Sequence, residues 1–380
     1  MDFSFTEEQG ALREVLSRLL AKNCSFAQRQ AARDSELGFR MENWRSLAEL
    51  GVLALPFPEE VGGIGGTAFD VMLVMEEMGR RLALEPYLTT VVLAGGIIRD
   101  GGSEDQKATL LPEIASGRLL LTLASYEPRS RYDLNRVATA AVAKGSGWRL
   151  SGSKAVVIGG PSADNFIISA RTSGNPEDDH GISLFLVNRD VPGLSVSGYP
   201  TQDGGRAAEL GLNAVSLGPE SLVGKRDEGL PLIEKAIDCA NAALCAEAVG
   251  IMSALNAETL EYLKTRKQFG VPIGSFQALK HRMADMSIAI EQARSMMYLA
   301  AAKVESAAPV ERRRAVAAAK ALVGKCGRLI GQEAVQFHGG MGVTDELIVG
   351  HYFKRLIMIN ATFGDVAHHL NRFGKLIAAE

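Results

Sequence analysis

The most constraining feature of the sequence is a short break between two long helical stretches. Residues 231–264 and 276–303 are rich in Ala and Leu at helical spacing, and the segment G-V-P-I-G at 270–274 separates them. Helix interiors tolerate Gly poorly and Pro hardly at all, so this segment predicts a sharp corner. Arg266 precedes the corner and Phe269 lies in it. Because a guanidinium can donate two hydrogen bonds to a phosphate and an aromatic ring can pack beside another ring, the corner suits a planar anionic cofactor.

The rest of the chain changes its pattern twice. Residues 1–118 show helical apolar spacing, beginning with the capping box T-E-E-Q at Thr6 to Gln9. Over residues 119–228, short segments rich in Val, Ile and Ser alternate with turn residues, which predicts a compact antiparallel β domain. Helical spacing returns over 229–380, where we expect four long helices at residues 231–264, 276–303, 311–337 and 347–377. The predicted fold is therefore α+β, with a helical domain, a β domain and a four-helix bundle in that order.

Composition narrows the class of partner. The 380 residues carry a formal net charge of -3 without a sustained Lys/Arg block, which argues against nucleic acid or an anionic membrane as the main partner. The four cysteines show neither C-x-x-C pairing nor metal-ligand spacing, which favours a reducing compartment. The adjacent histidines His368 and His369 make a poor metal clamp, and we expect no metal site. No segment approaches the roughly 20 apolar residues that a membrane span needs, so a cytoplasmic protein is expected.

Two motifs give the sequence a family resemblance. RKQFGVPIGSFQ at 266–277 resembles the acyl-CoA dehydrogenase signature R-x-Q-F-G-x-P-I-x-x-F-Q, and QFHGGMG at 336–342 is similar to the same family's Q-x-x-G-G-x-G. The resemblance spans the whole chain and implies the acyl-CoA dehydrogenase fold, an acyl-CoA substrate, FAD as cofactor, an electron-transfer protein as acceptor and a tetramer of identical or related subunits. It also implies that the FAD of a neighbouring subunit contacts Arg266, Gln268, Phe269, Gln277, Gln336, Gly339 and Gly340.

Three segments depart from the family pattern. Where the family's flavin loop reads T-E-P-G-A-G-S-D, residues 126–133 read Y-E-P-R-S-R-Y-D, and W-I-T beside the flavin ring is replaced by V-V-I at 156–158. Bulk at a Gly position bars a close backbone approach to a ligand. The family's C-terminal E-G-T segment matches Phe363, Gly364 and Asp365, so Phe363 replaces the catalytic glutamate.

A replacement base is therefore needed, since oxidation at the α and β carbons of a thioester requires a carboxylate to take the α-proton. Glu247 is the only charged residue between Asn241 and Ser253, and its neighbours at helical spacing are apolar. We weigh Glu247 as the base against the alternative of a carboxylate that pairs with an arginine at a subunit contact. Asp365 is a second candidate base.

Three functions are compatible with these features. Within the family, the F-G-D ending, the helix glutamate and the altered flavin loop most resemble a subunit of a heteromeric dehydrogenase, of the pimeloyl-CoA dehydrogenase small-subunit type. The chain is then either an acyl-CoA dehydrogenase that uses FAD, or a non-catalytic partner that completes the flavin site of another subunit through Arg266 and Gln336. A flavin-dependent oxygenase or oxidase of the same fold is a third choice.

Overall fold

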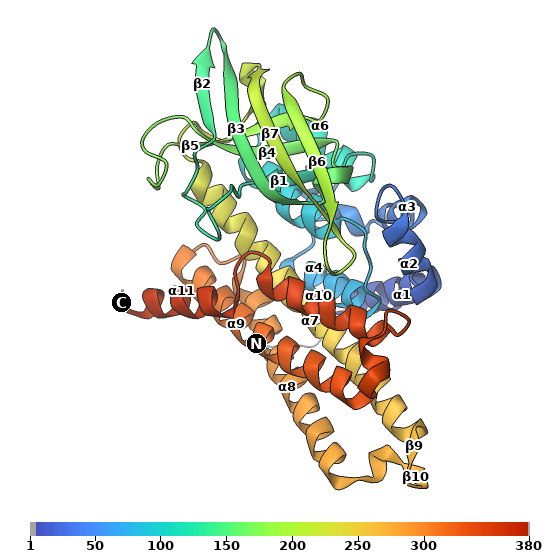
Figure 1. Cartoon of the computed structure of the whole chain (residues 1–380). Helices are drawn as coiled ribbons and strands as arrows, with labels where there is room; N and C mark the ends of the chain where they lie inside the picture. Colours follow the sequence, from blue (N-terminus) through green and yellow to red (C-terminus); the bar gives the residue numbers. More distant parts are fainter. Residues whose placement is uncertain (1–4, 379–380) are drawn as a thin grey trace. The chain divides into compact units, whose positions relative to one another are not determined.

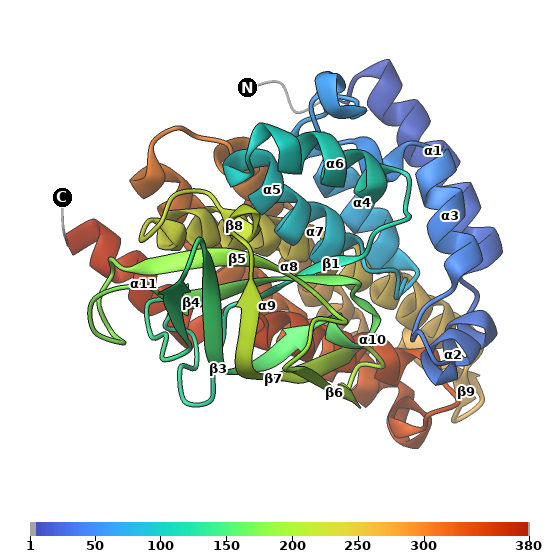
Figure 2. The same ribbon diagram turned by 90° about the horizontal axis from the view of Figure 1, so that it is seen from above.

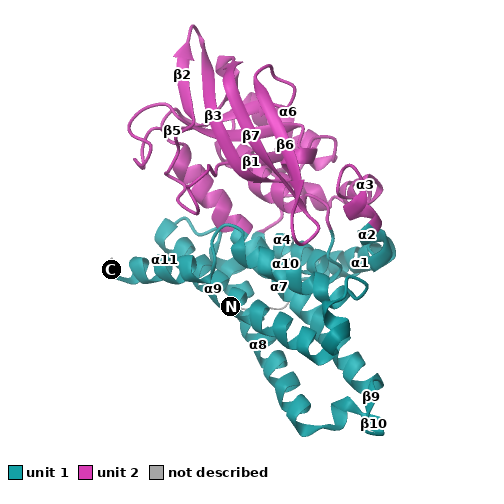
Figure 3. Cartoon of the chain, viewed as in Figure 1, with its two compact units in different colours: residues 1–30, 68–83, 241–380 teal, residues 31–67, 84–240 magenta. Residues whose placement is uncertain are grey.

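The computed structural model describes residues 5–378, which form two compact units. Of the described residues, unit 1 contains 5–30, 68–83 and 241–378, and unit 2 contains 31–67 and 84–240 (Figure 3). The helices α2 (Phe26–Asp34) and α7 (Gly229–Thr265) contribute residues to both units. Each unit is therefore assembled from segments that lie far apart in the sequence.

Unit 1 is helical. Besides its parts of α2 and α7 it consists of α1 (Glu7–Asn23), α4 (Ala68–Arg80), α8 (Gln277–Lys303), α9 (Pro309–His338), α10 (Ile348–Ala361), α11 (Val366–Ala378), two short strands, β9 (Lys267–Gln268) and β10 (Val271–Pro272), and the 3₁₀ turns η6 (Ile273–Ser275) and η7 (Gly339–Val343) (Figure 1). The predicted capping box at the start of α1 is confirmed, because Thr6 and Gln9 each accept a hydrogen bond from the other's backbone N–H at 3.2 Å.

The last predicted helix is wrong in one respect. Residues 347–377 form two helices, α10 and α11, separated at Thr362 to Asp365. Phe363 and Gly364 adopt φ values of 56° and 116°, which lie outside the helical region. The side chain of Asp365 then caps α11 by accepting a hydrogen bond from the N–H of His368 at 2.8 Å.

Unit 2 is built on an eight-stranded sheet. Its strands are β1 (Leu121–Ala124), β2 (Ala140–Lys144), β3 (Gly147–Ile158), β4 (Asn165–Arg171), β5 (Ile182–Asn188), β6 (Leu194–Pro200), β7 (Arg206–Leu217) and β8 (Leu222–Val223). They pair in the order β6-β7-β3-β2-β4-β5-β8, and β1 pairs in parallel with β4. Figure 2 shows β3, β7 and β6 side by side in this sheet. The predicted β domain thus forms, with mostly antiparallel pairing.

Helical segments complete unit 2. They are α3 (Met41–Glu49), α5 (Gly96–Gly101), α6 (Glu104–Ala115), the π-helix η3 (Tyr87–Gly95) and the 3₁₀ turns η1 (Val52–Ala54), η2 (Glu59–Val61), η4 (Gly160–Ser162) and η5 (Pro219–Ser221). The π-helix packs against β1 and α5, and all nine of its residues are buried. The sequence does not predict this segment, because its continuous apolar run lacks the period of an amphipathic helix.

Within residues 5–378, one helix, α7, is long and apolar enough to cross a membrane by length and composition. Its most apolar 18-residue window has a mean hydropathy of 1.3, and 89% of that window is buried. Burial of this kind is typical of the central helix of a protein core.

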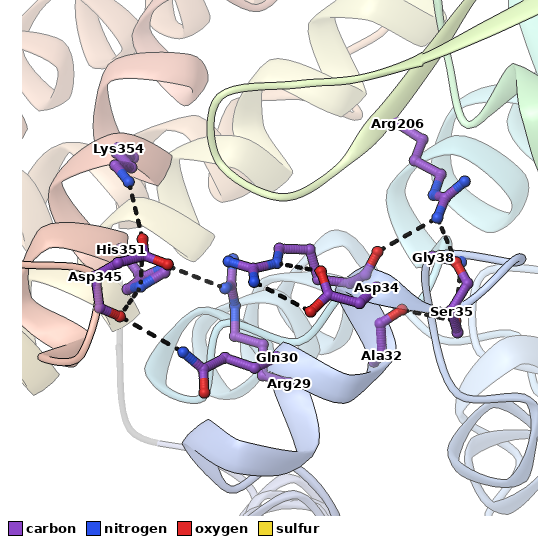
Figure 4. A network of polar contacts seen from close by, with 11 residues as sticks. Arg29, Gln30, Ala32, Asp34, Ser35, Gly38, Arg206, Asp345, His351 and Lys354 are labelled. Atoms are coloured by element: carbon purple, nitrogen blue, oxygen red, sulfur yellow. Dashed lines mark hydrogen bonds and ion pairs between the residues drawn. The ribbon is translucent and has the colours of Figure 1, made fainter.

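Polar side chains join distant segments within each unit (Figure 4). In unit 1, the Arg29 guanidinium lies 3.5 Å from Nδ1 of His351, whose Nε2 lies 3.0 Å from the carbonyl oxygen of Asp345. Burial lowers the pKa of His351. In unit 2, Arg206 donates to the carbonyl oxygen of Ser35. These contacts tie α2 to α10, and the end of α2 to β7.

Candidate functional site

The predicted corner between α7 and α8 is a tight β-hairpin. Strands β9 and β10 pair antiparallel, so Phe269 and Gly270 form a two-residue loop with φ values of 54° and 80°. Such loops require positive φ at both central positions, where glycine is favoured and a bulky residue is strained. The structure therefore holds an aromatic side chain in an unfavourable backbone conformation at the tip of the hairpin.

The tip of this hairpin is exposed. Phe269 leaves 92% of its surface accessible, although its ring lies 6.2 Å from that of Phe276. Arg266, Gln268 and Gln277 are also exposed. The structure thus brings together the four cofactor residues predicted from the first signature, on a surface that the chain itself leaves open.

The second signature lies next to the first. Gln336 is in the last turn of α9, and Gly339 and Gly340 begin η7. His338, directly before Gly339, stacks on Tyr262 of α7 with ring centroids 4.3 Å apart. Tyr262 is one helical turn before Arg266, so this stacking fixes the end of α9 against the end of α7. Two motifs that are about seventy residues apart in sequence are therefore neighbours in unit 1.

These residues fit the adenosine diphosphate part of a flavin nucleotide by the chemistry of their donors. Arg266 offers a forked cation for a diphosphate, Gln268, Gln277 and Gln336 offer carboxamides, and Phe269 offers a ring face. A Cβ atom at Gly339 or Gly340 would meet no other atom within 4 Å, so open space lies beside the backbone at the start of η7. A groove of about 540 Å³ also lies between α7 and α8, lined by apolar residues such as Leu260 and Met283 and by Lys264 and Lys280.

The altered flavin loop at 126–133 contains no glycine, but two of its residues keep the left-handed backbone conformation that glycine favours. Arg129 and Arg131, which replace the family's glycines, have φ values of 75° and 48°, and both are exposed. Glu127 and Ser130 point inward and are buried. The loop therefore turns its two arginines outward and anchors itself through the residues between and before them.

A buried ion pair holds this loop and was not predicted. Glu127 accepts hydrogen bonds from Nζ of Lys154 at 2.6 Å and from the N–H groups of Ala138 and Thr139 at 2.8 and 3.0 Å. Burial lowers the pKa of Lys154 to about 8, although the negative charge of Glu127 opposes this shift. The only sequence signal was a lysine directly before the apolar run A-V-V-I at 155–158.

Glu247 lies in an ion pair. Its carboxylate, 5% exposed, accepts hydrogen bonds from Nε of Arg355 at 2.6 Å and from Nη2 at 2.8 Å. Arginine pairing was the alternative that the sequence left open, and here the arginine belongs to α10 of the same chain. A Cβ atom at Gly79 would collide with the carbonyl oxygen of Glu247, so α4 packs closely against α7 at this residue. Glu247 as a base remains a prediction.

Phe363 and Asp365 lie in the turn between α10 and α11. The Phe363 side chain is buried at 7% exposure, and the Asp365 carboxylate serves as the cap of α11. Among the described residues, no hydrogen bond joins Asp365 to Glu247.

Comparisons with known proteins agree over the whole chain. Family models described as the acyl-CoA dehydrogenase N-terminal, middle and C-terminal domains match residues 6–118, 122–215 and 227–376. A Bacillus subtilis protein named probable acyl-CoA dehydrogenase YngJ is 32% identical over 351 residues, which cover 91% of each chain.

Two solved structures are also similar. The Tcur3481-Tcur3483 steroid ACAD has a TM-score of 0.88 and 33% sequence identity over 98% of each chain. The ChsE4-ChsE5 complex from Mycobacterium tuberculosis has a TM-score of 0.90 and 29% identity over 100% of each chain. The family models and similar solved structures, among them FAD complexes, confirm the predicted fold class and cofactor. The chain belongs to the acyl-CoA dehydrogenase family, whose members are FAD-dependent oxidoreductases.

Proposed function

We propose that this chain is a subunit of an oligomeric acyl-CoA dehydrogenase and that the tip of its α7–α8 hairpin binds the FAD of a neighbouring subunit. The enzyme oxidises an acyl-CoA thioester at the α and β carbons. When bound, FAD supplies the acceptor for the hydride that leaves the β-carbon. Arg266 neutralises the diphosphate, Gln268, Gln277 and Gln336 donate hydrogen bonds, and Phe269 covers the adenine or ribose.

The observation that carries this proposal is the exposed, strained tip. A phenylalanine that is 92% exposed at a φ of 54° is retained at a cost in stability. A ligand or partner that covers this ring would offset the cost, because burial of apolar surface is favourable.

The Arg266→Ala variant tests the proposal directly. Loss of a charged hydrogen bond of about 1.5–3 kcal/mol predicts FAD that dissociates about 10- to 100-fold more readily. Lys267→Ala is the matched control, because Lys267 is the adjacent exposed cation of the hairpin. The flavin content of the purified protein, measured from its visible absorbance, gives the result. Equal flavin retention in both variants would contradict the proposed role of Arg266.

Removal of the α-proton is assigned to Glu247, with Asp365 as the second candidate. The ion pair with Arg355 occupies both oxygens of Glu247, so the carboxylate must leave this pair, at least in part, to accept a proton. Glu247→Gln should keep the shape of the side chain and abolish reduction of the flavin by acyl-CoA. Turnover at the wild-type rate in this variant would discard the assignment.

The residues at the two candidate base positions also favour a second function, that of a non-catalytic subunit. Phe363 occupies the position of the family's glutamate, and Glu247 is held by Arg355, so neither position offers an unengaged carboxylate. A non-catalytic subunit that completes the FAD site of a related partner would need neither. The chain expressed alone separates the two: a yellow protein that oxidises an acyl-CoA supports the enzyme, and a colourless one supports the partner.

The proposed assembly is a homotetramer or a heterotetramer with a related subunit. The similar ChsE4-ChsE5 structure is a complex of two named components, which favours the heteromeric form. We also propose an electron-transfer protein as the acceptor and a cytoplasmic location.

A further inference from the structure

The groove between α7 and α8 is bounded at one end by the hairpin that joins these helices (Figure 1). Pro272 and Gly274 of the hairpin line this end, and a Cβ atom at Gly274 would lie 2.9 Å from the carbonyl oxygen of Leu263. The hairpin therefore packs directly against α7 and forms a wall of the groove. The lining residues of α7 run from Asn256 to Lys264, which corresponds to a length of about 12 Å at 1.5 Å per residue.

The middle of the groove is apolar. Leu260 of α7 lines it from one helix, and Met283 and Ala284 line it from the other. Leu260 leaves 38% of its surface accessible, so part of this apolar wall is uncovered within the chain. The volume of about 540 Å³ is within the range of about 300–1,000 Å³ in which proteins bind small molecules. A ligand that covers Leu260 would gain free energy, because it removes apolar surface from water.

The end of the groove beside the hairpin is positively charged. Lys264 is one helical turn after Leu260, and Lys280 is one turn before Ala284, so both ammonium groups belong to this end. Lys264 forms an ion pair with Glu261 at 2.7 Å, but within residues 5–378 the Lys280 side chain has no hydrogen-bond or ion-pair partner. None of the described residues that line the groove carries a carboxylate. The groove therefore presents an uncompensated positive charge next to an apolar wall.

This arrangement selects a ligand by its chemistry. A wholly apolar molecule would leave the two cations unused, and a small inorganic anion would leave Leu260 and Met283 uncovered. A molecule with an anionic head and one apolar chain uses both parts of the groove, because an ammonium group forms charge-assisted hydrogen bonds with carboxylate or phosphate oxygens.

We propose that the groove binds a single acyl chain that ends in an anionic head group. The head lies between Lys264 and Lys280, and the chain lies along the apolar middle of the groove. Neither candidate base, Glu247 or Asp365, lines the groove. The groove is thus a second acyl site, at which no proton is removed, and this inference goes beyond the proposed function.

A photoreactive fatty acid locates the site. The probe is dodecanoate with a diazirine near the middle of its chain, irradiated with the purified holoprotein, and peptide mass spectrometry identifies the labelled residues. We expect the label within residues 256–264 and 280–287. Lys280→Glu should lower this labelling about 10-fold, because it removes a charge-assisted contact and adds repulsion. Lys325→Glu is the matched control, because Lys325 is an exposed lysine of α9 that does not line the groove.

Unlabelled competitors identify the head group and its source. Dodecanoate and dodecyl phosphate should compete about 10-fold better than dodecanol, which has the same chain without a charge. Octanoate should compete less well than dodecanoate, because fewer methylene groups leave water. Stronger competition by dodecanoate than by dodecanoyl-CoA identifies a free fatty acid as the ligand, and the reverse order identifies the coenzyme A thioester.

Two results would overturn the proposal. One is a label that is confined to other segments, or that is equal in the wild type and in Lys280→Glu, and the other is equal competition by dodecanol and dodecanoate. Should Lys280→Glu fail to fold, Leu260→Glu places a charge in the apolar middle of the groove and should also lower the labelling.

The same samples separate this inference from assembly and from the proposed function. A label in the groove that appears only when Ile288→Lys dissociates the protein would assign the groove to a subunit contact and overturn the proposal. A colourless, inactive protein that is labelled in the groove would contradict the proposed enzyme and keep this inference. A yellow protein that turns over acyl-CoA without a label in the groove would do the reverse.

Discussion

At the scale of single residues, the backbone of the 126–133 loop is held in a conformation that suits glycine better than arginine. Arg129 has a φ of 75° and an exposed side chain. Arg129→Gly should raise the free energy of unfolding by about 0.5–1 kcal/mol, since relief of left-handed strain exceeds the added chain entropy of glycine. Chemical denaturation measures the change.

The control for this substitution is in the same connection between β1 and β2. Arg136 is exposed and lies outside the set of residues with positive φ. It donates to the carbonyl of Arg129 at 3.2 Å, so Arg136→Gly should lower the stability. Destabilisation by Arg129→Gly as well would show that the left-handed arginine is stabilised by its side chain.

The pairing of Glu247 with Arg355 makes a second residue-scale prediction. Arg355→Met should destabilise the protein by about 3–5 kcal/mol, because it leaves a buried carboxylate without its cation. The double variant Glu247→Leu with Arg355→Met should recover most of this loss, since it removes both charges. Urea unfolding of the two single variants and the double variant completes the cycle, and additive losses would argue against direct coupling.

At the scale of elements, a cluster of charges joins α1, α4 and α8. The Glu76 carboxylate, 1% exposed, lies 2.7 Å from Arg80, 2.8 Å from Arg294 and 3.8 Å from Arg13. Burial alone would raise its pKa, but the hydrogen bond from Arg294 and the nearby positive charges lower the pKa overall. The folded protein therefore favours the charged form of Glu76 more than the unfolded chain does.

The sign of the pH dependence follows from this lowered pKa. The contribution of Glu76 to stability is complete above its unfolded pKa, near 4.5, and is lost as the pH falls through the lower folded pKa. Glu76→Gln should destabilise the protein at pH 7 by about 3 kcal/mol and reduce the loss of stability on acidification below pH 5. Unfolding curves between pH 3 and 7 test this, and parallel pH profiles for both proteins would contradict it.

Local signals predicted the elements better than their contacts. The corner at 264–277 was readable from Gly270 and Pro272, and the start of α1 from its capping box, because both depend on neighbouring residues. The break at Thr362 to Asp365 was missed, since apolar spacing continues across it and no proline marks it. Nζ of Lys320, which is 42 residues before Thr362, donates to the carbonyls of Thr362 and Gly364 in this break, and the local sequence gives no sign of that contact.

The candidate site shows the same difference between local motifs, which the sequence reveals, and distant contacts, which it does not. The proposed cofactor residues could be named from the sequence because two contiguous motifs carry them. The partners of Glu247 and Glu127, Arg355 and Lys154, are 108 and 27 residues away, and a single sequence gives no measure of such pairings. A buried carboxylate in an apolar helix face therefore suggested a base and an ion pair equally well.

At the scale of the whole molecule, the exposed apolar side chains indicate which elements a subunit interface would cover. In unit 1 the most exposed of these are Phe269 at 92%, Val343 at 75% and Ile288 at 57%. They belong to the hairpin tip, η7 and α8, the elements that carry or adjoin the two signature motifs. An interface at these elements would bury them, and burial of each side chain contributes about 1.5–3 kcal/mol.

The proposed tetramer therefore makes a prediction about Ile288. Ile288→Lys places a charge on the exposed face of α8 and should shift the purified protein toward smaller species, because an interface would have to desolvate that charge. Val142→Lys is the matched control, since Val142 is 64% exposed on β2 of unit 2. Analytical ultracentrifugation at micromolar concentration distinguishes the species. A wild-type chain that sediments as a monomer, alone and when co-expressed with a related subunit, would refute the assembly, and with it the sharing of one FAD between two chains.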